Sequence, residues 1–188
     1  MAYNPKPTTT LDCILSEICP TLTVDIMPGE SDPANITLPQ QPLRSAMFPR
    51  ARQYHNSTFH CVSNPHWWDL DGTILLGSSG QSIDDIYKYV EEDDRVQMME
   101  RTLRWQHMAP TCPDTLWCHP FSDKDPFIME ETPHVYFMGN QDIYSSRLVE
   151  QANGVAVRLV TIPRFSETGQ LILLDLETLE TQAICFKA

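Results

Sequence analysis

The 188-residue sequence lacks any long apolar run. No stretch approaches the roughly 18 consecutive apolar residues that cross a bilayer, so the pattern predicts no membrane contact. The first ten residues are polar and carry no apolar core of the length found in signal peptides,. These absences favour an intracellular protein.

Basic side chains are also scarce. Thirteen Lys and Arg residues against 25 Asp and Glu residues give a net charge of −12, with four successive acids at residues 91–94. This balance repels a phosphate backbone, which disfavours independent binding to nucleic acid. We therefore expect any contact with DNA to be indirect, through a partner.

Paired cysteines are missing. The six cysteines are spread along the chain without the two-residue spacing that marks zinc or redox pairs,. Cys112, Cys118 and His119 come closest to a ligand cluster. The alternatives there are a zinc site and ordinary reduced cysteines, and the spacing favours reduced cysteines. We expect no cofactor.

Signatures of catalysis are absent as well. The sequence contains no Walker loop and no Gly-x-Ser-x-Gly elbow,. It also contains no Asp-x-His, Gly-Asp-x-x-Asp or Gly-His-x-His, the kind of motif that gathers carboxylates and imidazoles around two divalent cations,. His107 and His134 have no neighbouring ligand in sequence, so they are more typical of packing or capping than of metal binding.

The length of 188 residues predicts one domain,, and apolar periodicity predicts an α/β fold. A helix is expected at residues 8–19 with a cap from residues 8–10, a second after residues 77–80 with a Ser82–Asp85 capping box, and a third from Asp93 or Asp94,. Strands are expected at residues 22–26, 59–62, 73–76, 134–138, 155–161, 171–174 and 181–186, with a hairpin-like connection between 59–62 and 73–76 through Asp71-Gly72,. This order suits a mixed sheet with helices that ends in antiparallel strands.

Aromatic residues and one turn offer candidate binding features. Trp67 and Trp68 could form a stacking platform, but no basic residue lies close to them, which favours packing or partner binding,. Trp105, Trp117 and Met98-Met99 are expected in the core. The turn at residues 77–80 could present backbone amides to an anion, although the pattern favours a simple strand-to-helix turn.

Five prolines between residues 28 and 49 predict an extended, ordered loop,. Within it, prolines of the segment 38–43 fix φ and remove amide donors, so we expect this segment to stay out of any ladder and to be stiff. One alternative is that Leu38, Pro39, Pro42 and Leu43 close over a vacant site or dock a partner. The other is a buttress that packs Leu38, Leu43 and Phe48 onto the core.

Several longer motifs have a distinctive composition: Val24-Asp25-Ile26-Met27-Pro28-Gly29-Glu30, Leu38-Pro39-Gln40-Gln41-Pro42-Leu43, Leu76-Gly77-Ser78-Ser79-Gly80-Gln81, Pro113-Asp114-Thr115-Leu116 and Pro133-His134-Val135-Tyr136-Phe137-Met138-Gly139-Asn140. Together they resemble the small, B-type subunits of eukaryotic DNA polymerase delta, over residues 11–186. The proline-rich and Pro-Asp-Thr-Leu segments favour delta over the alpha and epsilon subunits. The resemblance implies part of an inactivated calcineurin-like phosphoesterase sandwich.

The resemblance also implies which positions once bound metal. Gly29-Glu30-Ser31-Asp32 stands where that superfamily has Gly-Asn-His-Asp, Ser79 stands where archaeal relatives have His, and Gly139-Asn140-Gln141-Asp142 stands at Gly-His-x-His. Glu30, Ser31, Asp32, Ser79, Asn140 and Asp142 then mark a degenerate metal site without imidazoles. No catalytic residue is implied. The alternative is a divergent metal-dependent phosphoesterase or nuclease that uses Glu30, Asp32 and Asp142 with His107 or His134.

The implied role is that of a non-catalytic accessory subunit in DNA replication. It would be nuclear and would join the carboxyl-terminal domain of the delta catalytic subunit to a further accessory subunit. The resemblance places residues 1–188 in the carboxyl-terminal part of the phosphoesterase-like domain. An oligonucleotide-binding fold and the first half of that domain would lie outside this chain.

Overall fold

The computed structural model describes residues 5–55, 57–151 and 154–186. The chain divides into two compact units. Unit 1 consists of residues 1–35 and 40–64, and unit 2 consists of residues 36–39 and 65–188. Length alone did not predict this division. Within the described residues, no helix has the length and apolar character needed to cross a membrane.

Unit 1 is built on helix α1, Lys6–Ile18, and a short parallel pair, β1, Val24–Ile26, and β2, Phe59–Cys61. Two 3-10 helices lie between the strands, at Ser45–Met47 and Ala51–Tyr54. Helix α1 begins two residues earlier than expected because a proline occupies its first turn, where a missing amide costs nothing,. The expected cap at residues 8–10 is wrong, since the hydroxyls of Thr9 and Thr10 bond back to carbonyls of the same helix.

The core of unit 1 is small and is closed by a buried carboxylate. The rings of Phe48 and Phe59 meet edge to face with centroids 5.6 Å apart, and Leu15 packs into the same cluster. Asp12 is 2% exposed, and its carboxylate accepts the backbone amides of Arg50 and Ala51 at 3.1 and 2.9 Å. These bonds satisfy the open amides of a 3-10 helix, so they join α1 to that helix.

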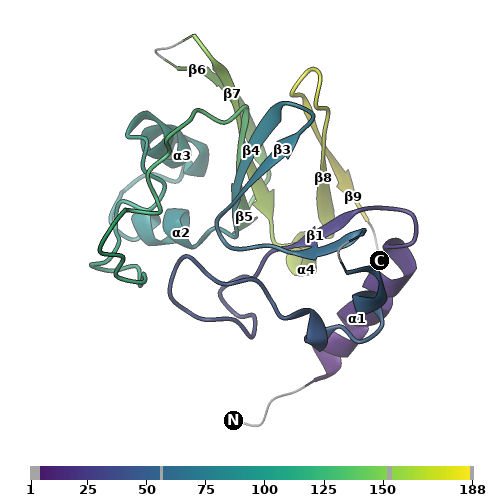
Figure 1. The fold of residues 1–188 in the computed structure, drawn as a ribbon. Helices are drawn as coiled ribbons and strands as arrows, with labels where there is room; N and C mark the ends of the chain where they lie inside the picture. Colours follow the sequence, from purple (N-terminus) through teal and green to yellow (C-terminus); the bar gives the residue numbers. More distant parts are fainter. Residues whose placement is uncertain (1–4, 56, 152–153, 187–188) are drawn as a thin grey trace. The chain divides into compact units, whose positions relative to one another are not determined.

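Unit 2 is centred on a five-stranded sheet in the order β3-β4-β5-β7-β6 (Figure 1). The three inner strands are parallel and both edge strands are antiparallel to their neighbours. The strands are β3, His66–Leu70; β4, Thr73–Ser78; β5, Val135–Gln141; β6, Ser145–Glu150; and β7, Ala156–Pro163. The predicted mixed sheet is therefore confirmed.

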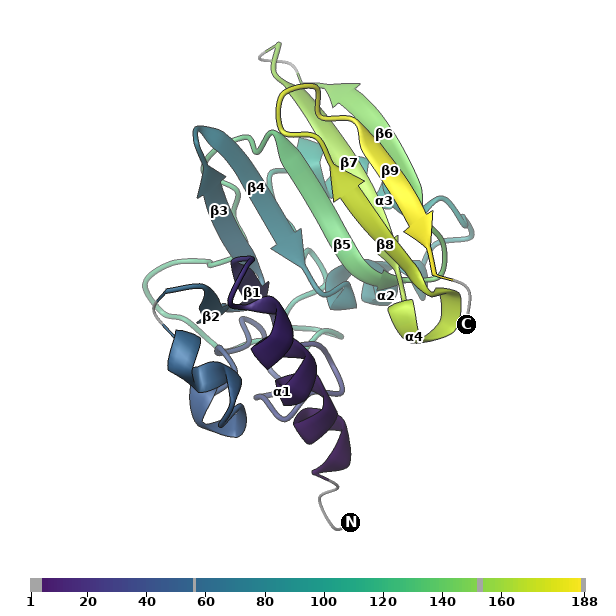
Figure 2. The same ribbon diagram turned by 90° about the vertical axis from the view of Figure 1, so that its right-hand side faces the viewer.

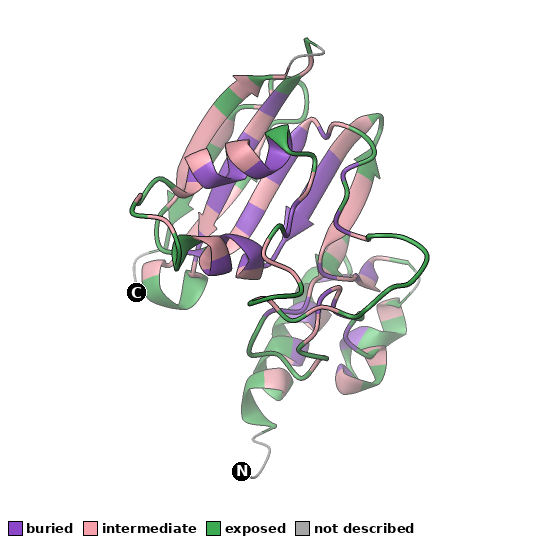
Figure 3. Ribbon diagram, turned by 90° about the vertical axis from the view of Figure 1, so that its left-hand side faces the viewer, coloured by how far each residue is buried: buried purple, intermediate pink, exposed green. Residues whose placement is uncertain are grey.

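Two layers cover this sheet. Helices α2, Gln81–Tyr87, and α3, Arg95–Arg104, lie on one face (Figure 3). The hairpin of β8, Gln170–Leu174, and β9, Thr181–Cys185, lies on the other, preceded by the short helix α4, Phe165–Thr168 (Figure 2). Alternation along β5 serves both layers, because Tyr136 packs toward the helices and Val135 toward the hairpin,. The predicted antiparallel ending is confirmed.

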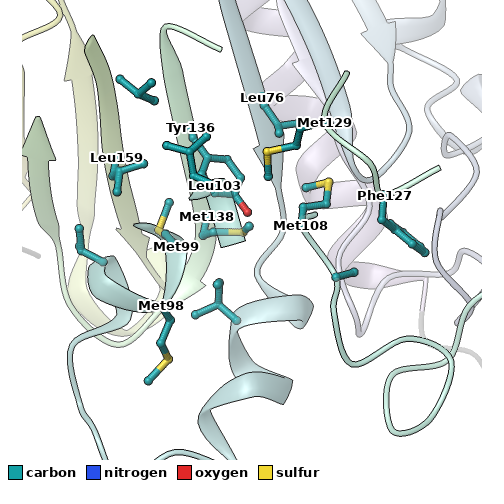
Figure 4. Close-up of a cluster of buried hydrophobic side chains, with 14 of the residues drawn as sticks. Leu76, Met98, Met99, Leu103, Met108, Phe127, Met129, Tyr136, Met138 and Leu159 are labelled. Carbon is teal, nitrogen blue, oxygen red and sulfur yellow. The ribbon is translucent and has the colours of Figure 1, made fainter. Parts of the chain in front are cut away.

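The core on the helix side is rich in methionine (Figure 4). Its buried methionines are Met98, Met99, Met108, Met129 and Met138. Thioether side chains are flexible and fill the irregular space between helices and sheet. Tyr136 is fully buried among them, its hydroxyl lies 3.2 Å from that of Thr102, and burial raises its pKa. The phenol therefore stays neutral at physiological pH.

Two local expectations are wrong, and two strands were missed. The Asp71-Gly72 turn joins β3 to β4, whereas strand 59–62 pairs with β1. Trp105 and Trp117 are 61% and 65% exposed and do not belong to the core. Strands β3 and β6 were not anticipated. Met98 and Met99 are buried, as expected.

The helix caps were predicted unevenly. Helix α3 begins at Arg95, next to the expected start, and Asp94 caps it, because its side chain accepts the amide of Gln97 at 2.9 Å,. The Ser82–Asp85 capping box of α2 is wrong. Gly80 occupies the N-cap with φ of +108°, and both Ser82 and Asp85 are buried inside the helix.

The proline-rich segment of residues 38–43 takes part in two isolated β-bridges, although we expected it to stay out of any ladder. In unit 2, the amide of Leu38 donates to the carbonyl of Trp117 at 2.9 Å, and in unit 1 the amide of Gln40 donates to that of Asn64 at 2.7 Å. Prolines remove only their own amides, so the residues that alternate with them still bond. Leu38 is buried in the core of unit 2 and Leu43 in that of unit 1, as the packing alternative expects.

Candidate functional site

Two strand ends meet at the carboxyl edge of the unit 2 sheet. Strands β4 and β5 are parallel neighbours, so the residues that follow Ser78 and those that close β5 lie together. The side-chain amide of Asn140 donates to the carbonyl of Ser79 at 3.0 Å. Open α/β sheets bind their ligands at this edge. Ser79 and Asn140, two of the degenerate metal positions that the resemblance implies, are thus in contact.

Tight backbone turns hold this edge. Gly80 has φ of +108° and Asn140 has φ of +55°, a left-handed region that favours these two residue types,. A Cβ on Gly80 would lie 2.6 Å from the side-chain nitrogen of Gln141 and would also clash with the carbonyl of Gly139. No larger side chain fits there, so the glycine sets how closely the two strand ends approach.

An arginine that the sequence analysis missed lies at the centre of this edge. Arg95 Nη1 lies 2.7 Å from Asp84 Oδ1, and Nη2 lies 3.6 Å from Asp142 Oδ2. The guanidinium also sits 3.8 Å above the ring of Tyr87, and the side chain is only 12% exposed. A signal was present, because a cation in the first turn of a helix opposes the helix dipole unless partners compensate for it.

Neighbouring groups complete the charge balance. Gln141 is 2% exposed and its side-chain amide donates to the carbonyl of Gly139 at 3.1 Å. Arg164, which follows β7, places Nη1 3.2 Å from Asp142 Oδ1. Two guanidiniums therefore face the carboxylates of Asp84 and Asp142. The edge holds fixed positive charge of its own.

Within the residues that the structure describes, no group of three or more His, Cys, Asp and Glu side chains is arranged to hold a metal ion. Cys112 and Cys118 are free thiols, and burial together with the nearby Cys118 raises the pKa of Cys112 to about 12. In the described part of the chain, Cys112, Cys118 and His119 do not form a group that could hold a metal ion. His134 accepts the amide of Ile74 at 2.9 Å, a structural role.

Glu30, Ser31 and Asp32 form an exposed turn in unit 1. The carboxylate of Asp32 accepts the amide of Gly29 at 2.7 Å, so it shapes the turn. Their assignment as former metal positions stays a prediction, as does that of Ser79, Asn140 and Asp142.

A buried amide network behind that turn was also missed. Gln40 is 1% exposed, and its Nε2 donates to the carbonyls of Gly29 and Asn35 at 3.1 and 2.9 Å. Its Oε1 accepts from Asn64 at 2.8 Å. A run of polar residues between prolines gave no sign that one of them would be buried. Within unit 1, the network ties Gly29 and Asn35 to Gln40 and Asn64.

The two adjacent tryptophans do not share a surface. Trp67 packs against the helix-side core, while Trp68 stacks on Phe137 on the hairpin side, with centroids 5.6 Å apart. Successive residues of a strand point to opposite faces. The joint stacking platform is therefore wrong and the packing alternative is favoured. Partner binding by Trp67, Trp68, Leu38, Pro39, Pro42 or Leu43 stays a prediction.

A model of the family described as the B-type subunit of DNA polymerases alpha and epsilon matches residues 1–146. Among curated proteins, the chain is 50% identical over 181 residues to the DNA polymerase delta small subunit of Arabidopsis thaliana, which covers 96% of this chain and 41% of that protein. It is 48% identical over 181 residues to the rice protein of the same name, covering 96% of this chain and 42% of that protein. The corresponding Saccharomyces cerevisiae protein is 40% identical over 198 residues, with 90% and 40% covered. The chain spans about two fifths of the length of these relatives.

Proposed function

Because the chain belongs to the family of B-type subunits of DNA polymerases alpha and epsilon, we propose that it acts as a non-catalytic accessory subunit of a DNA polymerase delta complex in DNA replication. The observation that carries this proposal is 50% identity, over 96% of the chain, to a protein named DNA polymerase delta small subunit. The delta relatives agree with the motifs that favour delta over alpha and epsilon.

The carboxyl edge of the unit 2 sheet supports a role without catalysis. A two-metal phosphoesterase needs ligands that remain free to bind cations. Here Asp142 lies between the guanidiniums of Arg95 and Arg164, and the side-chain amide of Asn140 donates a hydrogen bond to the carbonyl of Ser79. Glu30, Ser31 and Asp32 would be the degenerate counterparts in unit 1. In this reading, the fold is retained for its surfaces.

The proposed partners follow from this reading. The chain would correspond to the carboxyl-terminal part of a B-type subunit, with an inactive phosphoesterase-like architecture. It would join the carboxyl-terminal domain of the delta catalytic subunit to a further accessory subunit, in the nucleus. A net charge of −12 supports contact with DNA only through the complex,.

Affinity purification tests the assignment directly. The protein is tagged at its own locus, isolated at physiological salt and analysed by mass spectrometry. We expect the delta catalytic subunit in near-equal amount, and nuclear fluorescence of a tagged copy. If purification returns catalytic subunits of polymerases alpha or epsilon instead, or none, the delta assignment is overturned.

A second experiment tests the absence of catalysis. The purified protein is assayed for bound Mn and Zn and for hydrolysis of a generic phosphodiester. We expect neither stoichiometric metal nor turnover. Turnover that disappears in Asp142→Ala would instead establish the phosphoesterase alternative.

A further inference from the structure

The segment of residues 105–134, which joins α3 to β5, contains no helix or strand. It is nevertheless anchored. The amide of Met108 donates to the carbonyl of Phe127 at 3.0 Å, and the amide of Met129 donates to the carbonyl of Gln106 at 2.8 Å. The side chains of Met108, Phe127 and Met129 are buried. Ordered loops of this length in compact units commonly carry function. The anchored backbone holds the outward side chains in place.

Large apolar side chains point outward from this segment. Phe121 and Ile128 are 44% and 51% exposed, and Trp105 and Trp117 are more exposed still. Each costs free energy while it faces water, and covering it would recover that free energy. Aromatic residues of this kind often dominate the binding energy of protein interfaces.

Two open hollows lie along the segment and share Lys124, Asp125 and Pro126 in their walls. One has a volume of about 460 Å³ and includes Phe121, and the other has a volume of about 340 Å³ and includes Ile128. We call them together the double hollow. Two neighbouring depressions of this size, separated by a ridge, suit alternate side chains of an extended chain.

The walls of the double hollow are acidic. One lysine, Lys124, faces four acids, which are Asp123, Asp125, Glu130 and Glu131. Asp125 is held by the amide of Phe127 and by His107, each at 2.9 Å. Burial raises its pKa, but these bonds outweigh that effect and the pKa lies below its ordinary range. In the part of the chain that the structure describes, the other three acids form no ion pair.

We propose that the double hollow docks an extended, basic segment of another polymerase subunit. Its Lys or Arg residues would face the acidic walls, and its apolar side chains would cover Phe121 and Ile128. The charge of the walls selects this occupant, because nucleic acid and a second copy of this −12 chain would both be repelled,. This inference rests on the proposed function for the existence of partner subunits.

Charge reversal in the complex tests the inference. Glu130→Lys with Glu131→Lys changes two exposed acids of the double hollow. The matched control, Glu177→Lys with Glu180→Lys, makes the same charge change on exposed residues between β8 and β9. Each variant is tagged in cells, and co-purified subunits are quantified with melting temperature as the check on folding. We expect the hollow variant alone to lose at least about fivefold of one partner subunit.

A zero-length carboxyl-to-amine cross-linker supplies the second readout. In the wild-type complex we expect links from Glu130 or Glu131 to lysines in one basic stretch of that same subunit. Phe121→Ser with Ile128→Ser should lower the same yield without altering the charge. Equal loss in the control variant, or full retention of every subunit in the hollow variant, overturns the inference. If wild-type protein recovers no polymerase subunit, the proposed function itself fails.

Discussion

At the scale of single residues, the guanidinium of Arg95 stabilises the carboxyl edge of the unit 2 sheet. Arg95 is shielded from solvent and contacts Asp84, Asp142 and the ring of Tyr87. Shielded ion pairs are weakened less by solvent than exposed ones, and loss of one partner leaves charge uncompensated. The stability of the carboxyl edge should therefore depend on this side chain.

We expect Arg95→Met to lower the free energy of unfolding by about 1–3 kcal/mol, because it removes the guanidinium partner of Asp84 and leaves Asp142 paired with Arg164 alone,. Arg104→Met is the control, since that side chain is 65% exposed and forms an ion pair with Glu100 on the same helix. The control should cost less than about 1 kcal/mol. Urea titration measures both. Equal effects would contradict a special role for Arg95.

A buried amide has the corresponding role in unit 1. Replacing Gln40 by Leu keeps most of the volume but removes the hydrogen bonds that its buried side chain makes with Gly29, Asn35 and Asn64. Unsatisfied buried polar groups cost about 1–3 kcal/mol each. We expect a fall in melting temperature well beyond that of the exposed neighbour Gln41→Leu, measured by circular dichroism. A neutral Gln40→Leu would show that the network contributes little.

At the scale of elements, the proline-rich segment lies where packing can be measured. Leu38 is 2% exposed in the core of unit 2. We expect Leu38→Ala to cost about 2–5 kcal/mol, as core truncations do. Leu22→Ala, at a position that is 62% exposed, should have little effect. The double variant Leu38→Asp with Leu43→Asp should accordingly show a large drop in melting temperature. Lost assembly at an unchanged melting temperature would favour docking instead.

Helix α2 carries a buried acid whose charge state links its stability to pH. Burial raises the pKa of Asp85, but hydrogen bonds from Thr115 at 2.6 Å and Lys88 at 2.9 Å outweigh it, so the pKa lies below the ordinary 3.8. The unfolded chain therefore binds this proton more readily. The stabilisation is complete well above pH 3.8 and is lost as pH falls through the folded-state pKa.

We therefore expect the stability difference between wild type and Asp85→Asn to be largest near neutral pH and to shrink toward pH 3. Denaturant titrations at both pH values measure it. Asp114→Asn, at an exposed position, is the control and should change stability little at neutral pH. A difference for Asp85→Asn that is the same at pH 7 and pH 3 would contradict the linkage.

Elements with local signals could be predicted from sequence, and those set by distant contacts could not. Helix α3 followed from its apolar spacing and from Asp94. The partner of β4 did not, because strand β3, which lies directly before the Asp71-Gly72 turn, was not recognised in the sequence and the turn was assigned to strand 59–62 instead. Ser79 and Asn140 were placed at strand ends, which sequence can locate. Arg95 was not found, since its partner Asp142 is far away in the chain.

At the scale of the whole molecule, charge dominates. With a net charge of −12, the isolated chain should bind DNA very weakly,. We expect no binding of single- or double-stranded oligonucleotides at physiological salt when protein reaches about 10 μM, measured by fluorescence anisotropy. Saturable binding below that concentration would reveal a basic surface that the net charge hides.

The opposite orientation of Trp67 and Trp68 has a spectroscopic consequence. The first indole reports on the layer under the helices and the second on the layer under the hairpin, although their Cα atoms are neighbours in the chain,. Trp105 and Trp117 face solvent, so their emission should lie to the red and change little on unfolding. Replacing these two by Phe, and then one of the adjacent pair, would leave a single emitter in a chosen layer. Loosening of the helices and departure of the hairpin could then be timed separately in one protein.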